Sequence, residues 1–535
     1  MFALIQSEIQ YWEETVKMRR GLWQAIALLS LTIVLVLSVP SKNVNAAGMT
    51  VTQAVIQGQN VVVTASGSST SDDGILHLYA QQVYESGAQG IEVAQAPAGA
   101  NPTFTFALGK GSANSNLYKK FTVVAVRGGV PTAVSNSRYI TNPEAAATHT
   151  AGRKDGSKKG LLPGNSVLNP GTLKNMGVHQ IIYNLPVGTL CTGGGVSYNY
   201  NGKTYNFNSS TVQQFDTLVS QMNNNGIQVT LILLNNLTGN AGLLHPLSRD
   251  NAGANYYAFN TMEQGGVEML EAAASFLGQR YSNNGHGTVD NWVIGNEVNA
   301  RAEWNYMNAA CGLNTFAQEY AKAVRIFYNG IKSENANARV YISIDQEWSR
   351  GDSALHYGAK PFMDAMNSYL TAEGNIDWGV ASHPYDVPLT DPVAWTKNSN
   401  YHPHSQSARY YTMENIDVLT DYLCQKALLS PTGQVRSVLC SEVGYSSTQG
   451  QDIQAASIVY AYLQAVSNQH IDGFILNREQ DHATEIAQGL ALGLLNPDGS
   501  KKLSWQYYVT AESAETQAAV SAIIGTPVTS LLTVR

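Results

Sequence analysis

The sequence is poor in charged residues, and in particular it lacks long basic runs. Charged side chains make up 13% of its 535 residues, and the formal net charge is −7. Basic residues cluster only in short pairs such as Arg153-Lys154 and Lys158-Lys159. Because binding to phosphate backbones needs clustered Lys and Arg, this distribution argues against a nucleic-acid partner. The 44% hydrophobic content still supplies enough material for a large core.

A single stretch of the sequence is apolar over a length that suits a membrane. It runs from Leu22 to Val39 after Arg19-Arg20, and it precedes Val44-Asn45-Ala46, a small-residue site of the kind that signal peptidase cleaves. We expect residues 1–46 to be a leader and signal peptide, so that the mature chain is secreted or cell-surface and has no membrane span. An uncleaved anchor is the alternative, since about 18 apolar residues just span a bilayer.

Cysteine is also scarce, with four residues in the whole chain. In an exported protein four cysteines permit two disulfides. Cys191 and Cys311 lie in loops that we expect on the same face of the fold, which favours a bridge between them. Cys424 lies on a predicted helix and Cys440 on a predicted strand, and two packed free thiols fit this pair equally well. The pairing stays open.

Residues 49–140 show short alternating strands that are separated by turn residues. The predicted strands run over residues 60–65, 76–84, 103–108 and 121–126, and turns such as Asp73-Gly74 and Gly128-Gly129 fall between them. Strands about ten residues apart without a helical pattern are typical of an immunoglobulin-like β-sandwich. We expect this region to be an accessory domain without catalytic groups, and residues 141–152 to be a linker.

From residue 153 to 535 strands alternate with amphipathic helices, which indicates a parallel sheet. Helices are predicted over residues 212–223, 267–281, 316–332, 416–429 and 453–466. Eight strands are predicted at residues 160–163, 178–185, 227–234, 292–294, 340–344, 378–381, 438–440 and 473–476. Eight such units over this length predict a (β/α)₈ TIM barrel, and a doubly wound sheet is the alternative on periodicity alone.

Carboxylates follow two of the predicted barrel strands directly. Glu297 comes after the fourth strand in Gly295-Asn296-Glu297, and Glu442 comes after the seventh strand. Catalytic residues of such barrels gather at the carboxyl ends of the strands. Strand ends avoid uncompensated charge, so two carboxylates facing each other across the barrel mouth indicate a catalytic pair. A structural salt-bridge pair is the alternative.

These segments resemble those of the clan A glycoside hydrolases, which have Asn-Glu after strand four and Glu after strand seven. The resemblance covers about residues 160–508, and it extends to exported bacterial members of the clan, so no particular substrate comes with it. It implies that Glu297 is the acid/base and Glu442 the nucleophile of a retaining glycosidase, with Asn296 at the sugar 2-hydroxyl. Such an enzyme needs two carboxyls about 5–5.5 Å apart. It also needs Glu297 to be protonated at the start, and burial and the negative charge of Glu442 would raise its pKa for this.

Further residues are candidates for contacts with a sugar. His383 and Tyr385, after the sixth strand, resemble the clan residues that contact the nucleophile, although they would equally cap the turn before Pro384. Trp348 and Trp304 are candidate stacking platforms, because a flat aromatic surface matches the apolar face of a sugar, and core positions are their alternative. Asn235 ends the third strand, where an ordinary turn fits as well.

The clan usually has an Arg on an early strand and a Trp at the end of strand eight, and neither is present here. Arg478, after the eighth strand, is a candidate replacement for that Arg. The missing Arg and Trp bear on how the sugar is recognised more than on which reaction is catalysed. The chain is therefore predicted to be a monomeric, secreted O-glycosyl hydrolase that cleaves β-linked oligo- or polysaccharides.

Two other functions compete with hydrolysis by two carboxylates. The first is an inactive carbohydrate-binding protein on the same fold, for which a close carboxylate pair has no use. The second is a metal-dependent esterase, which needs clustered His and Asp ligands. The spacing of the histidines near the strand ends is not that of metal ligands, so we expect neither a metal nor another cofactor. These histidines are His383, His402, His404 and His482.

Overall fold

The computed structural model describes residues 48–153 and 156–535. Its larger part is a closed barrel of eight parallel strands, joined in chain order and closed by pairing of the first strand with the last. The barrel strands are β10 Lys159–Leu161, β11 Gln180–Pro186, β14 Gln228–Leu234, β15 Asn291–Ile294, β16 Arg339–Ile344, β17 Trp378–Ser382, β18 Val438–Val443 and β19 Ile471–Leu476. This topology excludes the doubly wound sheet.

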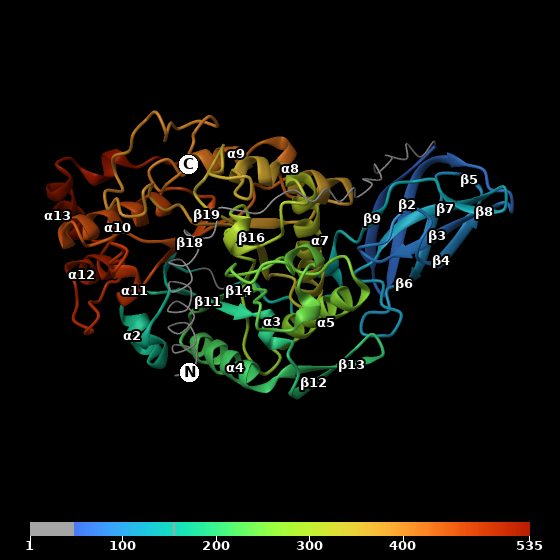
Figure 1. Cartoon of the computed structure of the whole chain (residues 1–535), viewed down its shortest axis with the longest axis horizontal. Coiled ribbons are helices and arrows are strands. Elements are labelled where there is room, and N and C mark those ends of the chain that lie inside the picture. The colour runs from blue at the N-terminus through green and yellow to red at the C-terminus, as the bar shows by residue number, and fades with distance from the viewer. Residues whose placement is uncertain (1–47, 154–155) are drawn as a thin grey trace, which may run out of the picture.

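Helices follow the strands and surround the barrel (Figure 1). The longest of them, α7, has a buried face of large apolar residues at helical spacing, as expected for a helix that packs on a sheet. The α-helices are α2 Pro170–Asn175, α3 Val187–Leu190, α4 Ser209–Asn224, α5 Gln264–Arg280, α6 Arg301–Trp304, α7 Leu313–Lys332, α8 Ala359–Ala372, α9 Asp417–Leu423, α10 Gln451–Val466, α11 Ala483–Ile486, α12 Leu503–Val509 and α13 Ala514–Ile524.

Short elements connect these units. A hairpin of β12 Gly195–Tyr200 and β13 Lys203–Asn208 leads into α4, whose first turn is capped by the side chain of Asn208. Such a cap satisfies an amide that has no partner within the helix. The 3₁₀ helices are η1 Pro143–Ala146, η2 Asn165–Leu168, η3 Ala241–Leu243, η4 Pro246–Ser248, η5 Lys426–Leu428 and η6 Val528–Leu531.

Branched and aromatic side chains fill the inside of the barrel. They come from alternate positions of neighbouring strands and form one layered cluster, as in other closed parallel barrels. The cluster consists of Ile182, Ile232, Leu234, Val293, Tyr341, Ala381, Leu439 and Ile475, together with Tyr256 from a loop. The barrel is therefore packed solid, and a binding site has to lie in the loops at one of its ends.

The N-terminal β-region, residues 48–139, contains two antiparallel sheets. One sheet has the strands β1, β2, β5 and β6, and the other has β3, β4, β7, β8 and β9. Alternate residues of β1, β2 and β3 are buried, which is the pattern of strands with one face on a core. The strands are β1 Met49–Gln57, β2 Asn60–Ser69, β3 Ile75–Gln81, β4 Ile91–Pro97, β5 Gly99–Ala100, β6 Thr103–Ala107, β7 Lys120–Arg127, β8 Val130–Ala133 and β9 Arg138–Tyr139.

The β-region lies at one end of the molecule, against α5 and α7 (Figure 1). The Tyr118 hydroxyl is 2.6 Å from the Ser275 hydroxyl, and Asn329 Nδ2 donates to the carbonyl of Leu117 at 2.9 Å. Lys110 forms an ion pair with Glu334 at 3.0 Å. One hydrophobic cluster continues from the β-region into the barrel helices. The contact therefore combines apolar packing with buried hydrogen bonds and an ion pair.

The segment expected as a linker follows the barrel surface closely. His149 exchanges backbone hydrogen bonds with Glu334 and Ala336, at 3.0 and 2.9 Å. Asn337 Nδ2 donates to the carbonyls of Thr150 and Ala151. The segment is thus attached to the loop between α7 and β16 by its own backbone.

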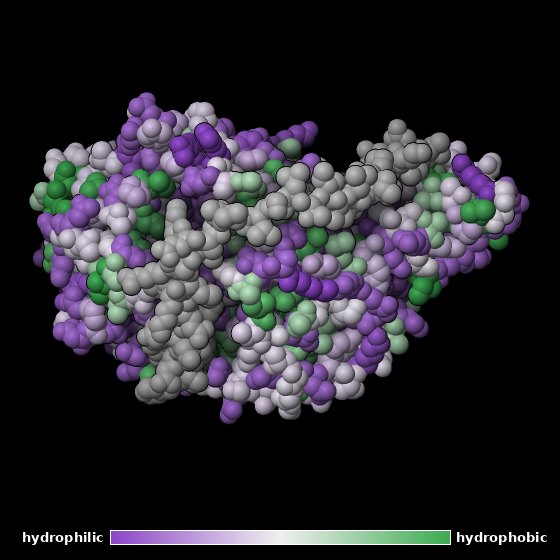
Figure 2. All heavy atoms as spheres, viewed as in Figure 1, coloured by the Kyte–Doolittle hydropathy of each residue, from purple (hydrophilic) through white to green (hydrophobic). Residues whose placement is uncertain are grey.

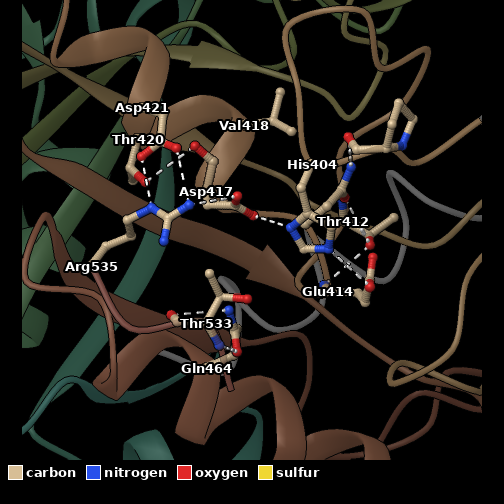
Figure 3. A network of polar contacts seen from close by, with 12 residues as sticks. His404, Thr412, Glu414, Asp417, Val418, Thr420, Asp421, Gln464, Thr533 and Arg535 are labelled. Atoms are coloured by element: carbon tan, nitrogen blue, oxygen red, sulfur yellow. Dashed lines mark hydrogen bonds and ion pairs between the residues drawn. The ribbon is translucent and has the colours of Figure 1, made fainter. Parts of the chain in front are cut away.

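The C-terminus is held by a polar network, which Figure 3 shows. Arg535 forms ion pairs with Asp417 and Asp421 of α9, at 3.1 and 2.8 Å. Asp417 also accepts from His404 at 2.7 Å, and His404 contacts Glu414 at 3.2 Å. The network therefore joins the last residue to α9 and to the loop that precedes α9.

The visible face of the molecule has hydrophilic and hydrophobic residues interspersed (Figure 2). Among the described residues, no helix has both the length and the apolar character that a bilayer crossing requires. The expected leader, residues 1–46, lies outside the described residues.

All eight predicted barrel strands are confirmed, with bounds that shift by one to three residues. The predicted helix over 416–429 is wrong at its end, because the chain becomes extended at Gln425 and continues as η5. The suggested disulfide is wrong too, since all four cysteines are free thiols. Cys311 Sγ instead contacts Arg301 Nη1 at 3.4 Å.

Candidate active site

Three side chains from different strands meet at the carboxyl end of the barrel. Glu297 is the third residue after β15, His383 follows β17 directly, and Glu442 is the penultimate residue of β18. One oxygen of each carboxylate and one ring nitrogen of the histidine all lie within 4.8 Å of one another. The parallel strands end at the same edge, so residues that are far apart in the sequence come together there.

His383 lies between the two carboxylates. Its Nδ1 is 2.9 Å from Glu297 Oε1 and 3.7 Å from Glu442 Oε2. The histidine side chain is fully buried, whereas the carboxylates are 17% and 26% exposed. The two carboxylates are therefore open to a ligand, and the buried ring contacts both of them.

The backbone at Glu297 has a conformation that a non-glycine residue rarely adopts. Its φ is 37°, in the left-handed region. Ser343, on the neighbouring strand β16, holds this conformation: its hydroxyl accepts from the Glu297 amide at 2.9 Å, and its carbonyl accepts from Val298. Such strain costs on the order of 1–3 kcal/mol and is concentrated at functional sites. It is a feature of this site that the sequence did not indicate.

Burial and neighbouring charges shift the protonation of the site. Burial raises the pKa of Glu297, and this effect outweighs the opposing hydrogen bond from His383. For His383, burial lowers the pKa, but the charges of Glu442 and Glu297 and the hydrogen bond to Glu297 raise it overall. The site thus holds a carboxyl that keeps its proton at higher pH than usual, next to a histidine that favours its charged form.

Tyr385 connects the site to the last strand. Its hydroxyl donates to Glu442 Oε2 at 3.4 Å and accepts from Asn477 Nδ2 at 2.6 Å. Asn296, next to Glu297 in the chain, is 7% exposed. The structure therefore places Tyr385 at Glu442 and His383 closer to Glu297, whereas the resemblance had implied that either of them would contact the nucleophile.

A second buried network lies directly beside the pair, after β16. Asp345 accepts from Asn299 Nδ2 at 2.5 Å and contacts His356 Nε2 at 2.6 Å. Its charge contributes to the raised pKa values of both Glu297 and His383. Neither Asp345 nor its partners were among the residues predicted for the site. The position of Asp345, immediately after the fifth strand, was the signal that could have indicated it.

Two predicted sugar-binding residues are core residues instead. Trp348 is fully buried, and its ring packs edge-on against Tyr411 and Tyr422, so no face is free for a sugar. Asn235 is 1% exposed, and its amide donates to the carbonyls of Leu243 and Ala258. Both predictions are wrong, because loops fold over these strand ends and use the side chains for packing and bracing.

Trp304 and Arg478 lie nearer to the surface. Trp304 ends α6 and is partly buried, with its ring 6.1 Å from that of Tyr256 at the top of the barrel core. Arg478 forms an ion pair with Glu485 at 2.9 Å, and its side chain is 14% exposed. A contact of either residue with a sugar stays a prediction.

The three clustered side chains are also of the types that bind a metal ion. Among the described residues they form the single group of three or more His, Cys, Asp or Glu side chains with ligand atoms so close together. His383 Nδ1, however, is within hydrogen-bond distance of Glu297 Oε1, and a metal would need that nitrogen free of its proton. A metal ion bound to His383 Nδ1 would therefore replace this hydrogen bond. Assaying activity with and without a chelator tests which of the two is present.

A family model described as "Family of unknown function (DUF5722)" matches residues 151–530. The chain belongs to this family. The match covers the whole barrel and excludes the β-region, so the barrel is the part that members of DUF5722 share. No curated protein matches the chain.

Solved structures resemble this DUF5722 chain in fold. A family 39 glycoside hydrolase from Bacteroides cellulosilyticus WH2 is 16% identical over 84% of this chain and 79% of its own, with a TM-score of 0.45. An exo-β-1,4-mannosidase from Opitutaceae bacterium strain TAV5 is 15% identical over 69% of this chain and 60% of its own, at 0.41. A family 1 β-glucosidase from Thermotoga maritima is 11% identical over 64% of this chain and 84% of its own, at 0.39.

Proposed function

We propose that the protein is a retaining glycoside hydrolase that cleaves β-linked oligo- or polysaccharides. The observation that carries this proposal is the close pair Glu297 and Glu442 at the carboxyl end of a closed barrel, in contact with His383. Retaining enzymes hold their carboxyls about 5–5.5 Å apart, and inverting ones about 6.5–9.5 Å. Oxygens within 4.8 Å of each other support the first geometry.

The reaction has two displacements. In the first, a Glu442 oxygen forms a bond to the anomeric carbon while the bond to the leaving oxygen breaks, and Glu297 transfers its proton to that oxygen. In the second, Glu297 takes a proton from water, the water oxygen bonds to the anomeric carbon, and the ester to Glu442 breaks. The sum is the addition of one water molecule. Glu297 ends the cycle protonated, as it began.

The environments of the two carboxylates support these roles. The raised pKa of Glu297 suits a group that delivers a proton near neutral pH. Tyr385 directs its hydroxyl to Glu442, which stays accessible at 26% exposure. We assign to Asn296, the neighbour of Glu297 in the chain, a hydrogen bond to the sugar 2-hydroxyl, a contact that strengthens in the transition state.

The proposal includes export and an accessory role for the β-region. The apolar stretch from Leu22 to Val39 and the small residues after it support a secreted or cell-surface location. The β-region, of immunoglobulin-like type in its strand pattern, contributes no side chain to the carboxylate pair. We assign to it attachment or stabilisation rather than chemistry.

Hydrolysis of aryl β-glycosides tests the proposal. We expect release of the aryl group from at least one of the common β-hexosides or β-pentosides, unchanged by a chelator. Glu442→Gln should lower kcat by about 10³-fold or more, since it removes the nucleophile. An inactive, folded wild-type protein that binds oligosaccharides would identify the carbohydrate-binding alternative. Loss of activity with a chelator and recovery with a divalent cation would identify a metal-dependent hydrolase.

A further inference from the structure

A cavity of about 370 Å³ lies in the loop between β17 and α9, apart from the carboxylate pair. Its size is that of a small-ligand site. Residues from one continuous segment line it, among them Val387, Lys397, Tyr401, His402, Arg409 and Tyr410. None of them takes part in the proposed chemistry.

Aromatic side chains form much of the wall. Tyr401 is 47% exposed, so its ring is available to a ligand. The rings of His402 and Tyr410 lie 5.6 Å apart at an angle of 35°, and the Arg409 guanidinium lies 4.9 Å from the Tyr410 ring centre. Flat surfaces of this kind, edged by polar groups, suit the apolar face of a sugar ring and its hydroxyls.

The cationic side chains around the cavity already have carboxylate partners within the protein. Lys397, with a 3% exposed side chain, pairs with Asp386 at 2.8 Å and with Asp391 at 3.1 Å. Arg409 pairs with Asp352 at 3.5 Å. A charged ligand would have to displace one of these partners. The cavity therefore favours a neutral ligand with many hydroxyl groups.

Two buried polar atoms of the wall, His402 Nδ1 and Arg409 Nε, have no hydrogen-bond partner among the described residues. His402 is 5% exposed, and among the described residues none forms a hydrogen bond with its Nδ1. Burial, aided by the nearby charge of Lys397, lowers the pKa of His402 to about 4, so the ring is neutral at pH 7. Because an unpaired buried polar atom is unfavourable, a ligand hydroxyl at this nitrogen would be favoured.

The chain connects the cavity to the carboxylate pair. Val387, which lines the cavity, follows Tyr385 by two residues, so the α-carbons of Val387 and Tyr385 are at most about 7 Å apart. Tyr385 in turn contacts Glu442. The other end of the loop is fixed, because His404 contacts both Glu414 and Asp417 (Figure 3). A loop that is held at both ends keeps the cavity at the rim of the barrel mouth.

We propose that this cavity binds a neutral sugar unit of the substrate that lies beyond the two units joined by the cleaved bond. The inference rests on the proposed function and extends it. The substrate is then an uncharged chain of several sugars rather than a disaccharide. The cavity gives long chains an additional binding contact, and therefore a higher kcat/KM, which aryl monosaccharides are too short to use.

The test compares chain lengths. Wild-type protein and Tyr401→Ala are assayed on an aryl β-glycoside and on β-linked gluco-, manno- and xylo-oligosaccharides of two to six units. We expect kcat/KM of the preferred wild-type series to rise with length, and Tyr401→Ala to lower it about tenfold for the longest chain and less than twofold for the aryl glycoside. Leu389→Ala is the matched control, since Leu389 belongs to the same loop, is 44% exposed and is not among the cavity residues.

Direct binding separates this inference from the proposed function. The longest oligosaccharides are titrated calorimetrically into Glu442→Gln and into the same variant with Tyr401→Ala. Weaker binding in the double variant supports the cavity even if wild-type protein hydrolyses nothing, and in that case only the proposed function fails. The proposed role of the cavity is overturned if kcat/KM rises with chain length equally in wild type and Tyr401→Ala. It is also overturned if Tyr401→Ala lowers kcat/KM by the same factor on short and long substrates.

Discussion

At the scale of single residues, the site differs from a simple pair of facing glutamates. His383 is hydrogen-bonded to Glu297 rather than to Glu442, and Tyr385 contacts Glu442 instead. Glu297 also has a left-handed backbone conformation that Ser343 stabilises. The two carboxylates therefore occupy different environments. Different environments are what allow one of two like groups to be an acid while the other is a nucleophile.

The roles of the two carboxylates predict different products with azide. Glu297→Gln should still form a glycosyl-enzyme from an activated aryl glycoside, because such leaving groups need little protonation. Azide should then rescue turnover and give a β-glycosyl azide, since it attacks from the side of the missing base. With Glu442→Ala, azide should fill the space of the nucleophile and give the α-anomer. The product anomers are distinguished by proton NMR.

If Glu297→Gln gave the α-azide and Glu442→Ala the β-azide, Glu297 would be the nucleophile and Glu442 the acid/base. His383→Gln is a useful control, because it removes the charge next to Glu297 and leaves both carboxylates in place. It should shift the pH profile of kcat without producing azide rescue. Rescue of His383→Gln by azide would show that the histidine takes part in proton transfer itself.

At the scale of elements, the loop after β16 is held by the pair of His356, which is partly exposed, and Asp345, which is buried. Asp345 contacts His356 at 2.6 Å, with Glu347 and Asp352 close enough to add negative charge. Burial lowers the pKa of His356, but Asp345 and the other carboxylates outweigh it and raise the pKa to about 9. Folding therefore favours the protonated histidine. This pair fixes the loop that begins directly beside Glu297.

His356→Gln should destabilise the protein in a pH-dependent way. The pKa in the folded state lies above the value of 6.5 expected for the unfolded chain, so the stabilisation is complete below about pH 6.5 and is lost as the pH rises through 9. We expect the free energy of unfolding to fall by roughly 1–3 kcal/mol at pH 6 and much less at pH 10. Urea unfolding at both values measures this.

Asp345→Asn provides the partner in a double-mutant cycle. Because both substitutions remove the same pair, their effects at pH 6 should not add. Additive losses, or a loss for His356→Gln that is equal at pH 6 and pH 10, would show that the contact contributes little as an ion pair.

At the scale of the whole molecule, the β-region and the barrel share a buried contact. Asn329, on α7, is fully buried and donates to the Leu117 carbonyl, and Tyr118 reaches Ser275 on α5. Lost contacts of this kind would leave polar groups buried without partners. The two parts are thus expected to stabilise each other, although the β-region adds nothing to the carboxylate pair.

Asn329→Ala should weaken this contact without changing catalysis. It leaves the Leu117 carbonyl unpaired and opens a small gap, at a cost of about 1–3 kcal/mol. Hydrogen exchange should become faster in residues 108–127, while kcat/KM on an aryl glycoside stays within twofold. Asn367→Ala is the control, because Asn367 donates to Ala427 within the barrel part. Equal exchange in the β-region of both variants would contradict the coupling.

Much of the fold was determined by the sequence by itself. The eight strands were predicted from local patterns, namely short apolar runs such as residues 227–234 and 438–440 with amphipathic helices between them. The structure has the corresponding strands at residues 228–234 and 438–443. Glu297, His383 and Glu442 were predicted because chemistry-bearing residues follow strands directly. This rule needs only strand ends, and strand ends are local features of the sequence.

The tertiary structure alone decided which neighbours these residues have. Trp348 and Asn235 follow strands just as Glu297 does, yet loops from distant segments fold over them and make them core residues. The Cys191 and Cys311 bridge failed for the same reason, since loop paths set the distance between two thiols. The cavity of the β17–α9 loop likewise depends on how a long segment returns on itself. Strand patterns are encoded within a few residues, whereas loop packing depends on contacts between segments that are far apart in the chain.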